Sequence, residues 1–285
     1  MELNTRQAIL EKNLKTAHGR SLIASSMIGP LRQQRDYASV GRKAFLVDHL
    51  PNGALPYYDK DVDVTAYVVS EEGENIVTNS KGKRLLFPLF EIAANPEISL
   101  IEITNRRFDV IDRAIAKGTS DIMRAEDEKV FACIDALCDD PTAPNKDIVV
   151  TGNLTSTALA EAFSTIEEHD LRVAYVFCNA KDFADIRKWD RDTFDPESQG
   201  EILNTGVRSG IYGAKIVTSR VVPRGTIYIT AEPEFFGRMP IRYDLTVLSA
   251  DDPSRRMIGF SMFENIGIGL FNPYGAQRLK IVRSN

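Results

Sequence analysis

The sequence predicts an α+β fold, in which a long hairpin, a long helix and a mixed unit of shorter helices and strands follow one another. Apolar and polar residues alternate strictly over 62–68, a helical period runs from about residue 104 to 137, and short helices and strands alternate after residue 156. The 285 residues are 43% hydrophobic and 26% charged, which is typical of a globular chain with apolar material for one sizeable core or two smaller ones.

The N-terminal residues predict an arm without a core of its own. Residues 4–17 have the period of a short amphipathic helix, with Ile9, Leu10 and Leu14 on one side. The stretch from there to about residue 39 is polar and is interrupted by glycine and proline. We therefore expect residues 1–36 to form an arm that extends from the body of the protein.

A long β-hairpin is expected over residues 58–92. Its outgoing strand is the alternating stretch 62–68, its tip is polar and contains glycine, and it returns through the apolar residues 85–87. A lone two-stranded hairpin is marginally stable in water, so we expect it to lie against another subunit. The tip is acidic on the way out and basic on the way back, and its charged residues are candidate contacts: Glu71, Glu72, Glu74, Lys81, Lys83 and Arg84.

The stretch 104–137 predicts an amphipathic helix about 50 Å long, at 1.5 Å per residue. Asp139-Asp140-Pro141 follows it, and proline disfavours the helical conformation in the residue before it. The remaining patterns predict shorter elements, which are helices at 156–168 and 182–189 and strands at 173–177, 215–222, 226–231, 241–249, 257–271 and 279–282. A charged turn joins the two strands 241–249 and 257–271, and it supplies four more candidate contacts: Asp251, Asp252, Arg255 and Arg256.

Charge is divided unevenly between the arm and the body. The whole chain has a net charge of −5, but residues 1–43 hold eight basic and three acidic residues, a local charge of +5 that leaves −10 for the rest. An acidic body with a basic arm favours docking of the arm on something negative, either a neighbouring copy or nucleic acid. A solvated charged tail explains the charge alone equally well. The candidate contacts of the arm are Arg32, Arg35, Arg42 and Lys43.

No motif for catalysis, a cofactor or a metal stands out in the sequence. The three histidines do not form a paired metal-ligand motif, and Cys133, Cys138 and Cys178 lack zinc spacing, which favours reduced thiols. There is no GxSxG elbow and no phosphate-binding GxxxxGK[ST] loop, and the two glycines at 267 and 269 fall within a strand pattern. We predict no catalytic, cofactor-binding or metal-binding residues, no membrane span and no secretion signal.

The order of these parts, together with three stretches of sequence, resembles the Hong Kong 97-type major capsid proteins of tailed bacteriophages. Residues 255–276, RRMIGFSMFENIGIGLFNPYGA, look like the family's C-terminal strand, which runs through glycine to a proline and an alanine. Residues 213–225, GAKIVTSRVVPRG, resemble its strand followed by a VPxG turn, and residues 176–186 resemble its strand followed by a short helix. The resemblance covers the chain from about residue 36 onward.

The resemblance implies a division of the chain into domains. Residues 1–36 would be the arm and residues 58–92 the extended loop that lies on a neighbouring subunit. The peripheral domain would comprise 37–57, 93–148 and 237–271, with a spine helix at about 101–138. The axial α/β domain would comprise 149–236 and 272–285, and the turn 251–256 would meet its copies at three-fold positions.

The function implied is that of a major capsid protein, which self-assembles into the icosahedral head shell and encloses double-stranded DNA. Its expected partners are further copies in hexamers and pentamers, a portal, a scaffold and decoration proteins, and packaged DNA bound without sequence specificity. It would be assembled in the host cytoplasm and reside in the virion. The alternatives are an encapsulin-type protein compartment, because residues 4–17 resemble a cargo-docking helix, and an α/β enzyme with a diffuse carboxylate site.

Overall fold

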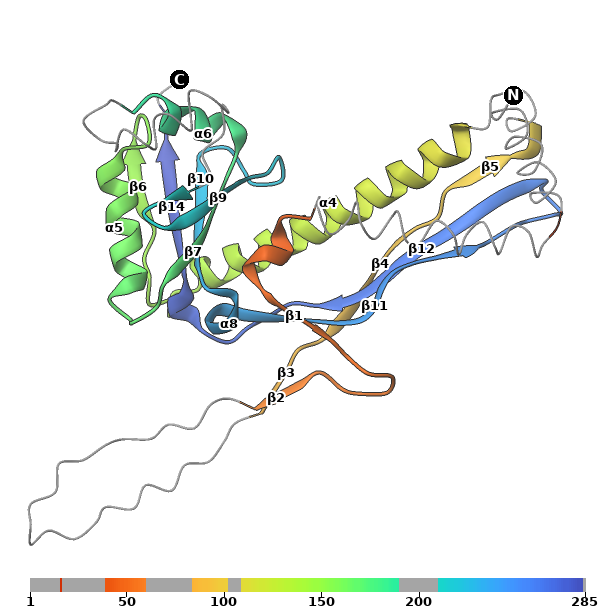
Figure 1. The fold of residues 1–285 in the computed structure, drawn as a ribbon, viewed down its shortest axis with the longest axis horizontal. Coiled ribbons are helices and arrows are strands. Elements are labelled where there is room, and N and C mark those ends of the chain that lie inside the picture. The colour runs from red at the N-terminus through yellow and green to blue at the C-terminus, as the bar shows by residue number, and fades with distance from the viewer. Residues whose placement is uncertain (1–15, 17–38, 60–83, 102–108, 190–209, 284–285) are drawn as a thin grey trace, which may run out of the picture.

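The computed structural model describes residues 16, 39–59, 84–101, 109–189 and 210–283. These residues form two six-stranded sheets, a two-stranded ribbon, and a long helix that extends from one sheet to the other (Figure 1). The predicted helix at 4–17, apart from residue 16, and the predicted strand at 62–68 lie outside the described residues. Within the described part of the chain, no helix is both long enough and apolar enough to cross a bilayer.

The first sheet is built on a long antiparallel pair, β11 (Gly237–Ser249) and β12 (Met257–Gly267). The strand order is β1-β11-β12-β4, with β13 beside β11 and β5 beside β12. The other four strands are β1 (Leu46–His49), β4 (Leu89–Ala94), β5 (Glu97–Ser99) and β13 (Gly269–Leu270). Residues 89–92, at the end of the expected extended loop, are therefore part of this sheet.

The second sheet has the strand order β6-β14-β10-β7-β9-β8 and mixes parallel and antiparallel pairs. Its strands are β6 (Ile148–Thr151), β7 (Val173–Cys178), β8 (Gly210–Ile211), β9 (Ala214–Thr218), β10 (Thr226–Ala231) and β14 (Ala276–Val282). Helix α5 (Ser156–Glu167) begins at Thr155, whose side chain accepts a hydrogen bond from the Ala158 amide. Its buried residues Leu159, Phe163 and Ile166 share one core with the strands.

Helix α4 (Asp109–Asp139) connects the two sheets because its buried residues belong to two different cores (Figure 1). Toward its start, Ile115 and Ile122 belong to a core with Phe260 of the first sheet. Toward its end, Phe131 stacks on Tyr228 of the second sheet, with 5.4 Å between ring centroids. Thus the long helix predicted from the sequence is present, and it ends two residues before Pro141.

Several predicted elements have different bounds in the structure. Helix α6 (Ala180–Arg187) begins earlier than predicted because the Asn179 side chain caps it, accepting a hydrogen bond from the Lys181 amide. The strand predicted to reach residue 222 ends at Thr218, and the strand predicted from residue 279 begins at Ala276. The single strand predicted over 257–271 is two strands, β12 and β13, because β13 leaves β12 and pairs with the start of β11.

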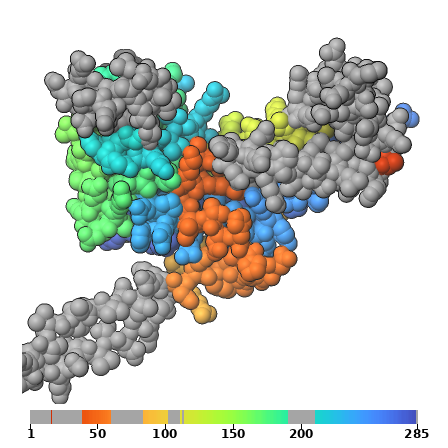
Figure 2. Space-filling model, in the orientation of Figure 1, coloured from red at the N-terminus to blue at the C-terminus, as the bar shows by residue number. Residues whose placement is uncertain are grey.

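Three short elements lie between the sheets. They are η1 (Gly41–Ala44), α8 (Pro233–Phe236) and η3 (Pro273–Gly275). The rings of Phe45 and Phe236 are 5.4 Å apart, which packs the segment after η1 against α8. In the space-filling view, residues 39–59, in orange, separate the green and cyan lobe of the second sheet from the blue strands of the first (Figure 2).

Candidate assembly surfaces

The two-stranded ribbon consists of β2 (Tyr57–Asp59) and β3 (Arg84–Leu86), at the base of the predicted hairpin. Tyr57 faces Leu86 across the ribbon, and their side chains are 52% and 54% exposed. Arg84 forms an exposed ion pair with Asp59, at 2.8 Å. The ribbon therefore presents an apolar pair and an ion pair on one solvent-facing side.

The other side of the ribbon fixes it to the protein body through Tyr58. The Tyr58 hydroxyl donates a hydrogen bond to Asp48 at 2.7 Å, and its ring lies 5.2 Å from that of Phe87. Burial raises the pKa of Tyr58, and the hydrogen bond to the Asp48 carboxylate raises it further. The predicted contacts Glu71, Glu72, Glu74, Lys81 and Lys83 lie outside the described residues, and only Arg84 is placed.

The charged turn between β11 and β12 is held by the side chain of Asp252. Its carboxylate accepts hydrogen bonds from the amide and hydroxyl of Ser254 and from the Arg255 amide, and these bonds lower its pKa. Arg255 forms an exposed ion pair with Glu97 of the same chain at 3.3 Å. Arg256 is exposed and has a positive φ of 51°. The turn thus presents arginines to solvent at one end of the first sheet.

The base of the predicted arm is anchored to α4. The Ser39 hydroxyl donates to Glu126 at 2.9 Å, and the Gly41 amide donates to Asp127 at 2.8 Å. Arg42 lies 2.7 Å from Glu126. These contacts fix the point from which the arm leaves the body.

Arg42 forms ion pairs with acidic residues of its own chain. Besides Glu126 it approaches Asp244 at 3.2 Å and Glu264 at 3.6 Å, and both glutamate side chains are fully buried. Buried carboxylates require a nearby positive charge, so Arg42 stabilises the contact of η1 with α4, β11 and β12. Lys43 is exposed, and the predicted contacts Arg32 and Arg35 lie outside the described residues.

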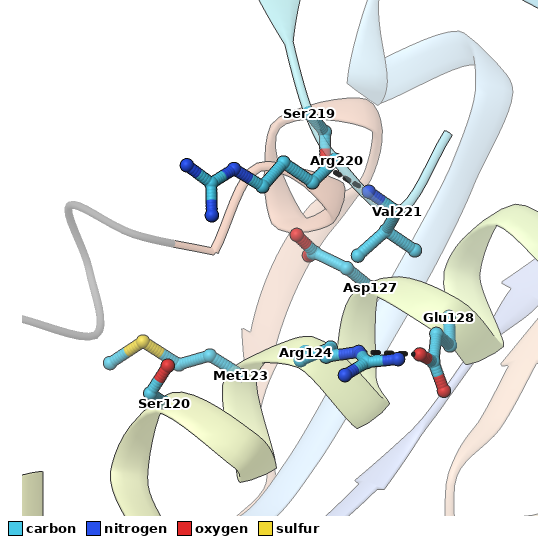
Figure 3. A pocket seen from close by; sticks show the side chains of 8 residues that line it. All are labelled: Ser120, Met123, Arg124, Asp127, Glu128, Ser219, Arg220 and Val221. Carbon is cyan, nitrogen blue, oxygen red and sulfur yellow. Dashed lines mark hydrogen bonds and ion pairs between the residues drawn. The ribbon is translucent and has the colours of Figure 1, made fainter. Parts of the chain in front are cut away.

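A cleft of about 590 Å³ lies between α4 and the turn after β9 (Figure 3). Its described lining residues are Ser120, Met123, Arg124, Asp127, Glu128, Ser219, Arg220 and Val221. Arg124 pairs with Glu128 at 2.9 Å, and Asp127 holds the base of the arm, so both carboxylates have a structural partner. The cleft is adjacent to the arm anchor.

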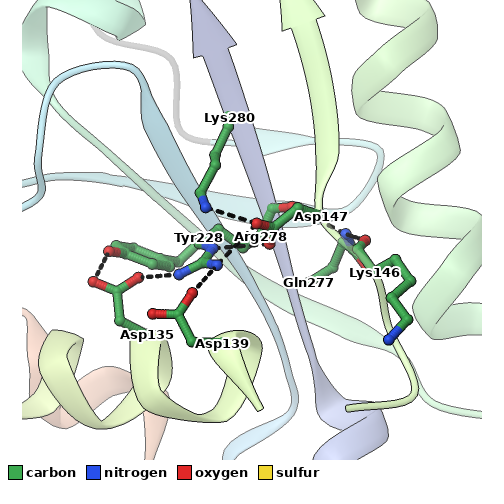
Figure 4. Close-up of polar contacts among 8 residues, drawn as sticks. All are labelled: Asp135, Asp139, Lys146, Asp147, Tyr228, Gln277, Arg278 and Lys280. Carbon is green, nitrogen blue, oxygen red and sulfur yellow. Dashed lines mark hydrogen bonds and ion pairs between the residues drawn. The ribbon is translucent and has the colours of Figure 1, made fainter. Parts of the chain in front are cut away.

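A second buried arginine, Arg278, joins the end of α4 to the second sheet (Figure 4). Its side chain is 4% exposed and forms ion pairs with Asp135, Asp139 and Asp147. Hydrogen bonds from Arg278 lower the pKa of Asp139. Burial alone would raise the pKa of Asp147, but bonds from Arg278 and Lys280 more than offset this and lower it. The cluster connects α4 to β14 and to the start of β6.

In the part of the chain that the structure describes, side chains of the kinds that bind metals do not cluster into a site. Among these residues, no group of three or more histidine, cysteine, aspartate or glutamate side chains is arranged to hold a metal ion. The three cysteines are free, and burial raises the pKa of Cys138 to about 11 and of Cys178 to about 12. These thiols stay protonated near neutral pH.

The sequence did not single out the exposed apolar residues as contacts. The structure exposes Tyr57 and Leu86 on the ribbon, and Phe235 and Tyr274 at 48% and 42% near one end of the second sheet. Alternation within a strand predicts that one side lies outside the core, but it does not tell whether that side faces solvent or a neighbouring subunit. An exposed aromatic residue becomes informative only when its neighbours in space are known.

Comparison with known proteins identifies the family. The profile of the family described as phage capsid protein matches residues 97–279, nearly two thirds of the chain. This range extends from β5 across α4 and both sheets into β14. No curated protein sequence matches the chain.

Solved structures share the fold at low sequence identity. The capsid of cyanophage P-SCSP1u is 14% identical, with a TM-score of 0.62 over 87% of this chain and 89% of that one. The mature capsid of bacteriophage PhiM1 is 11% identical, with a TM-score of 0.64 over 86% and 87%. A virus-like particle from Pyrococcus furiosus is 15% identical, with a TM-score of 0.58 over 90% and 98%.

The structure and the comparisons together confirm the predicted fold class and the predicted family resemblance. The α+β architecture is that of the Hong Kong 97-type capsid structures, and the family match favours a phage capsid over the encapsulin-type alternative. The chain belongs to the phage capsid protein family and is a major capsid protein that builds the shell of the virion.

Proposed function

We propose that this chain forms hexamers and pentamers of an icosahedral head through three surfaces: the ribbon with its hairpin, the turn between β11 and β12, and the basic arm. The role is structural rather than catalytic. The first sheet with α4 corresponds to a peripheral domain and the second sheet to an axial domain. The shell assembles in the host cytoplasm and encloses double-stranded DNA, with a portal, scaffold and decoration proteins as further partners.

The exposed side of the ribbon carries this proposal. The two strands pair with each other and with no other described strand, yet they present Tyr57 and Leu86 together to solvent. A two-stranded ribbon with an exposed apolar pair gains stability when a neighbour covers that pair. Because Tyr58 fixes the ribbon to the body, the exposed side has a defined direction in which to meet a neighbouring copy.

The arm supports assembly through its charge. Its base is fixed on α4 by Ser39 and Gly41, whereas its net charge is opposite to that of the rest of the chain. Attraction between the arm of one copy and the body of another adds contact area without enlarging the core. In a shell such weak contacts are repeated by symmetry, so their sum is large.

The test is assembly of purified subunits carrying Tyr57→Ser and Leu86→Ser. We expect the free subunits to keep their circular dichroism spectrum, since both side chains are already exposed, and the yield of shells seen by electron microscopy to fall. Val149→Ser, which removes an apolar side chain that is 60% exposed on β6 and lies outside the three proposed surfaces, is the matched control. Normal shell yield from the ribbon variant would contradict the proposed contact, and unsubstituted subunits that form no shells would contradict assembly itself.

A further inference from the structure

We propose that the basic segment 4–17 of one subunit docks on an aromatic surface at one end of the second sheet of a neighbouring subunit. This inference rests on the proposed function, because it assigns a partner surface to the arm. The aromatic surface consists of His169, Phe235 and Tyr274, with Glu168, Asp170 and Glu234 as its acidic rim.

Three loops that are distant from one another in sequence form this surface. The Glu232 amide donates to the Arg172 carbonyl at 3.0 Å, which joins the loop after α5 to the residue before α8. The Asn272 amide donates to the Phe236 carbonyl at 3.4 Å, which joins α8 to η3. Figure 1 shows α8, the lower end of α5 and the start of β14 at the end of the sheet opposite the C-terminus.

The centre of the surface is aromatic and open. The rings of His169 and Tyr274 are 4.3 Å apart, and Tyr274 remains 42% exposed. Phe235 is 48% exposed although its neighbour Phe236 is fully buried. The His169–Tyr274 ring pair, with Phe235 exposed on the neighbouring helix α8, provides a larger contact area than a single exposed residue, as expected of a binding surface.

The rim is acidic. The segments 167–172 and 232–236 hold five carboxylates and one arginine, Arg172. Glu168, Asp170 and Glu234 are exposed, and the Glu168 carboxylate lies 3.5 Å from the His169 ring. An acidic rim around an aromatic centre fits a basic amphipathic segment, which places its apolar side on the rings and its cations on the carboxylates.

The chain itself contains such a segment. Residues 4–17 have Ile9, Leu10 and Leu14 on one side of the predicted helix, with Arg6, Lys12 and Lys15 around them. The 21 residues between this segment and Ser39 span about 70 Å when extended, at roughly 3.3 Å per residue. This length exceeds that of α4 itself, 31 residues or about 46 Å at 1.5 Å per residue, so the segment can extend beyond its own subunit.

Crosslinking in full-length subunits tests the contact directly. Subunits with Asn13→Cys are mixed with subunits with Glu234→Cys, assembled, and oxidised, which removes two electrons and two protons as the disulfide forms and reduces the added oxidant, diamide. We expect a covalent dimer in the shells from this mixture. Asn13→Cys mixed with Leu248→Cys is the control, because Leu248 is also exposed but lies on the first sheet.

Charge exchange supplies a second measurement. Glu234→Lys and Lys12→Glu should each lower shell yield by about tenfold, since each lost contact is repeated at every copy, and the double variant should regain it. Asp121→Lys, on the exposed side of α4, should leave the yield unchanged. Shells without the dimer, a dimer equally abundant in the control, or no recovery in the double variant would each overturn the docking while leaving shell assembly itself intact.

Discussion

The guanidinium of Arg278 lies 2.8 Å from the carboxylate of Asp147, and the pair joins β14 to the loop before β6. The same guanidinium binds Asp135 and Asp139 at the end of α4, so one side chain connects this helix to the second sheet. Lys280 pairs with Asp147 at 2.7 Å. The relative position of helix and sheet therefore depends on a charge cluster as well as on the aromatic core around Phe131.

Acid should weaken this junction. Asp139 and Asp147 both have pKa values below the ordinary 3.8, so their ionised forms are favoured in the folded state. Their stabilisation is complete above about pH 5 and is lost as pH falls below about 4, through the lowered pKa values. We expect the urea midpoint of free subunits to fall over that range, and Asp147→Asn to make the fall shallower. An equally steep fall in the variant would contradict this assignment.

Removing the arginine should be more damaging than removing one acid. Arg278→Met leaves three carboxylates close together and should lower the free energy of unfolding by about 3 kcal/mol at pH 7. Urea unfolding of the free subunit measures the loss. Arg84→Met, which removes an exposed ion pair, is the control and should cost less than about 1 kcal/mol.

Gly225 in the turn after Pro223 should not tolerate a side chain. Its φ is +78°, and an added Cβ would lie 2.8 Å from the carbonyl oxygen of Ile281. Gly225→Ala should therefore lower the free energy of unfolding by about 2 kcal/mol or more, from backbone strain and contact together. Gly152→Ala is the matched control, because its φ is +93° but the space around it is open. Equal losses in the two variants would show that the contact with Ile281 contributes nothing.

The turn between β11 and β12 should stabilise shells more than subunits. Arg255 pairs with Glu97 only at an exposed site, so removing Arg255 and Arg256 should change subunit unfolding by less than about 1 kcal/mol. Shell melting should fall clearly, since the loss recurs wherever copies meet. Glu97→Ala removes the ion pair with Arg255 within the subunit but leaves both arginines available for contacts between subunits, so it is the control for the internal pair. An unchanged shell melting temperature in the double arginine variant would contradict the predicted role of the turn.

Deletion of residues 1–35 should spare the subunit and impair the shell. The deletion leaves Ser39, Gly41 and Arg42 to hold η1 on α4. We expect unchanged subunit unfolding but fewer or less stable particles, and a smaller dependence of shell stability on salt, because the lost attraction is between charges screened over about 8 Å at physiological salt. Hydrogen exchange that is equally slow for residues 5–35 in free subunits and in shells would contradict an assembly role for the arm.

The sequence by itself determined the order and type of the main elements. The helical period that became α4 and the patterns that predicted strands at 241–249 and from residue 257 are local patterns, and local patterns follow from backbone geometry and burial. The charge contrast between residues 1–43 and the rest also depends on composition alone.

Only the tertiary structure decided which distant residues meet. Arg42 belongs to the basic N-terminal stretch 1–43 by sequence, yet it lies between Glu126 and Glu264. Arg278 has partners more than 130 positions away in the chain. His169 meets Tyr274, and α8 with Phe235 lies beside η3, because hydrogen bonds join three loops at one end of a sheet. Such contacts depend on how helices and strands pack across the fold, and residue spacing along the chain carries no record of that packing.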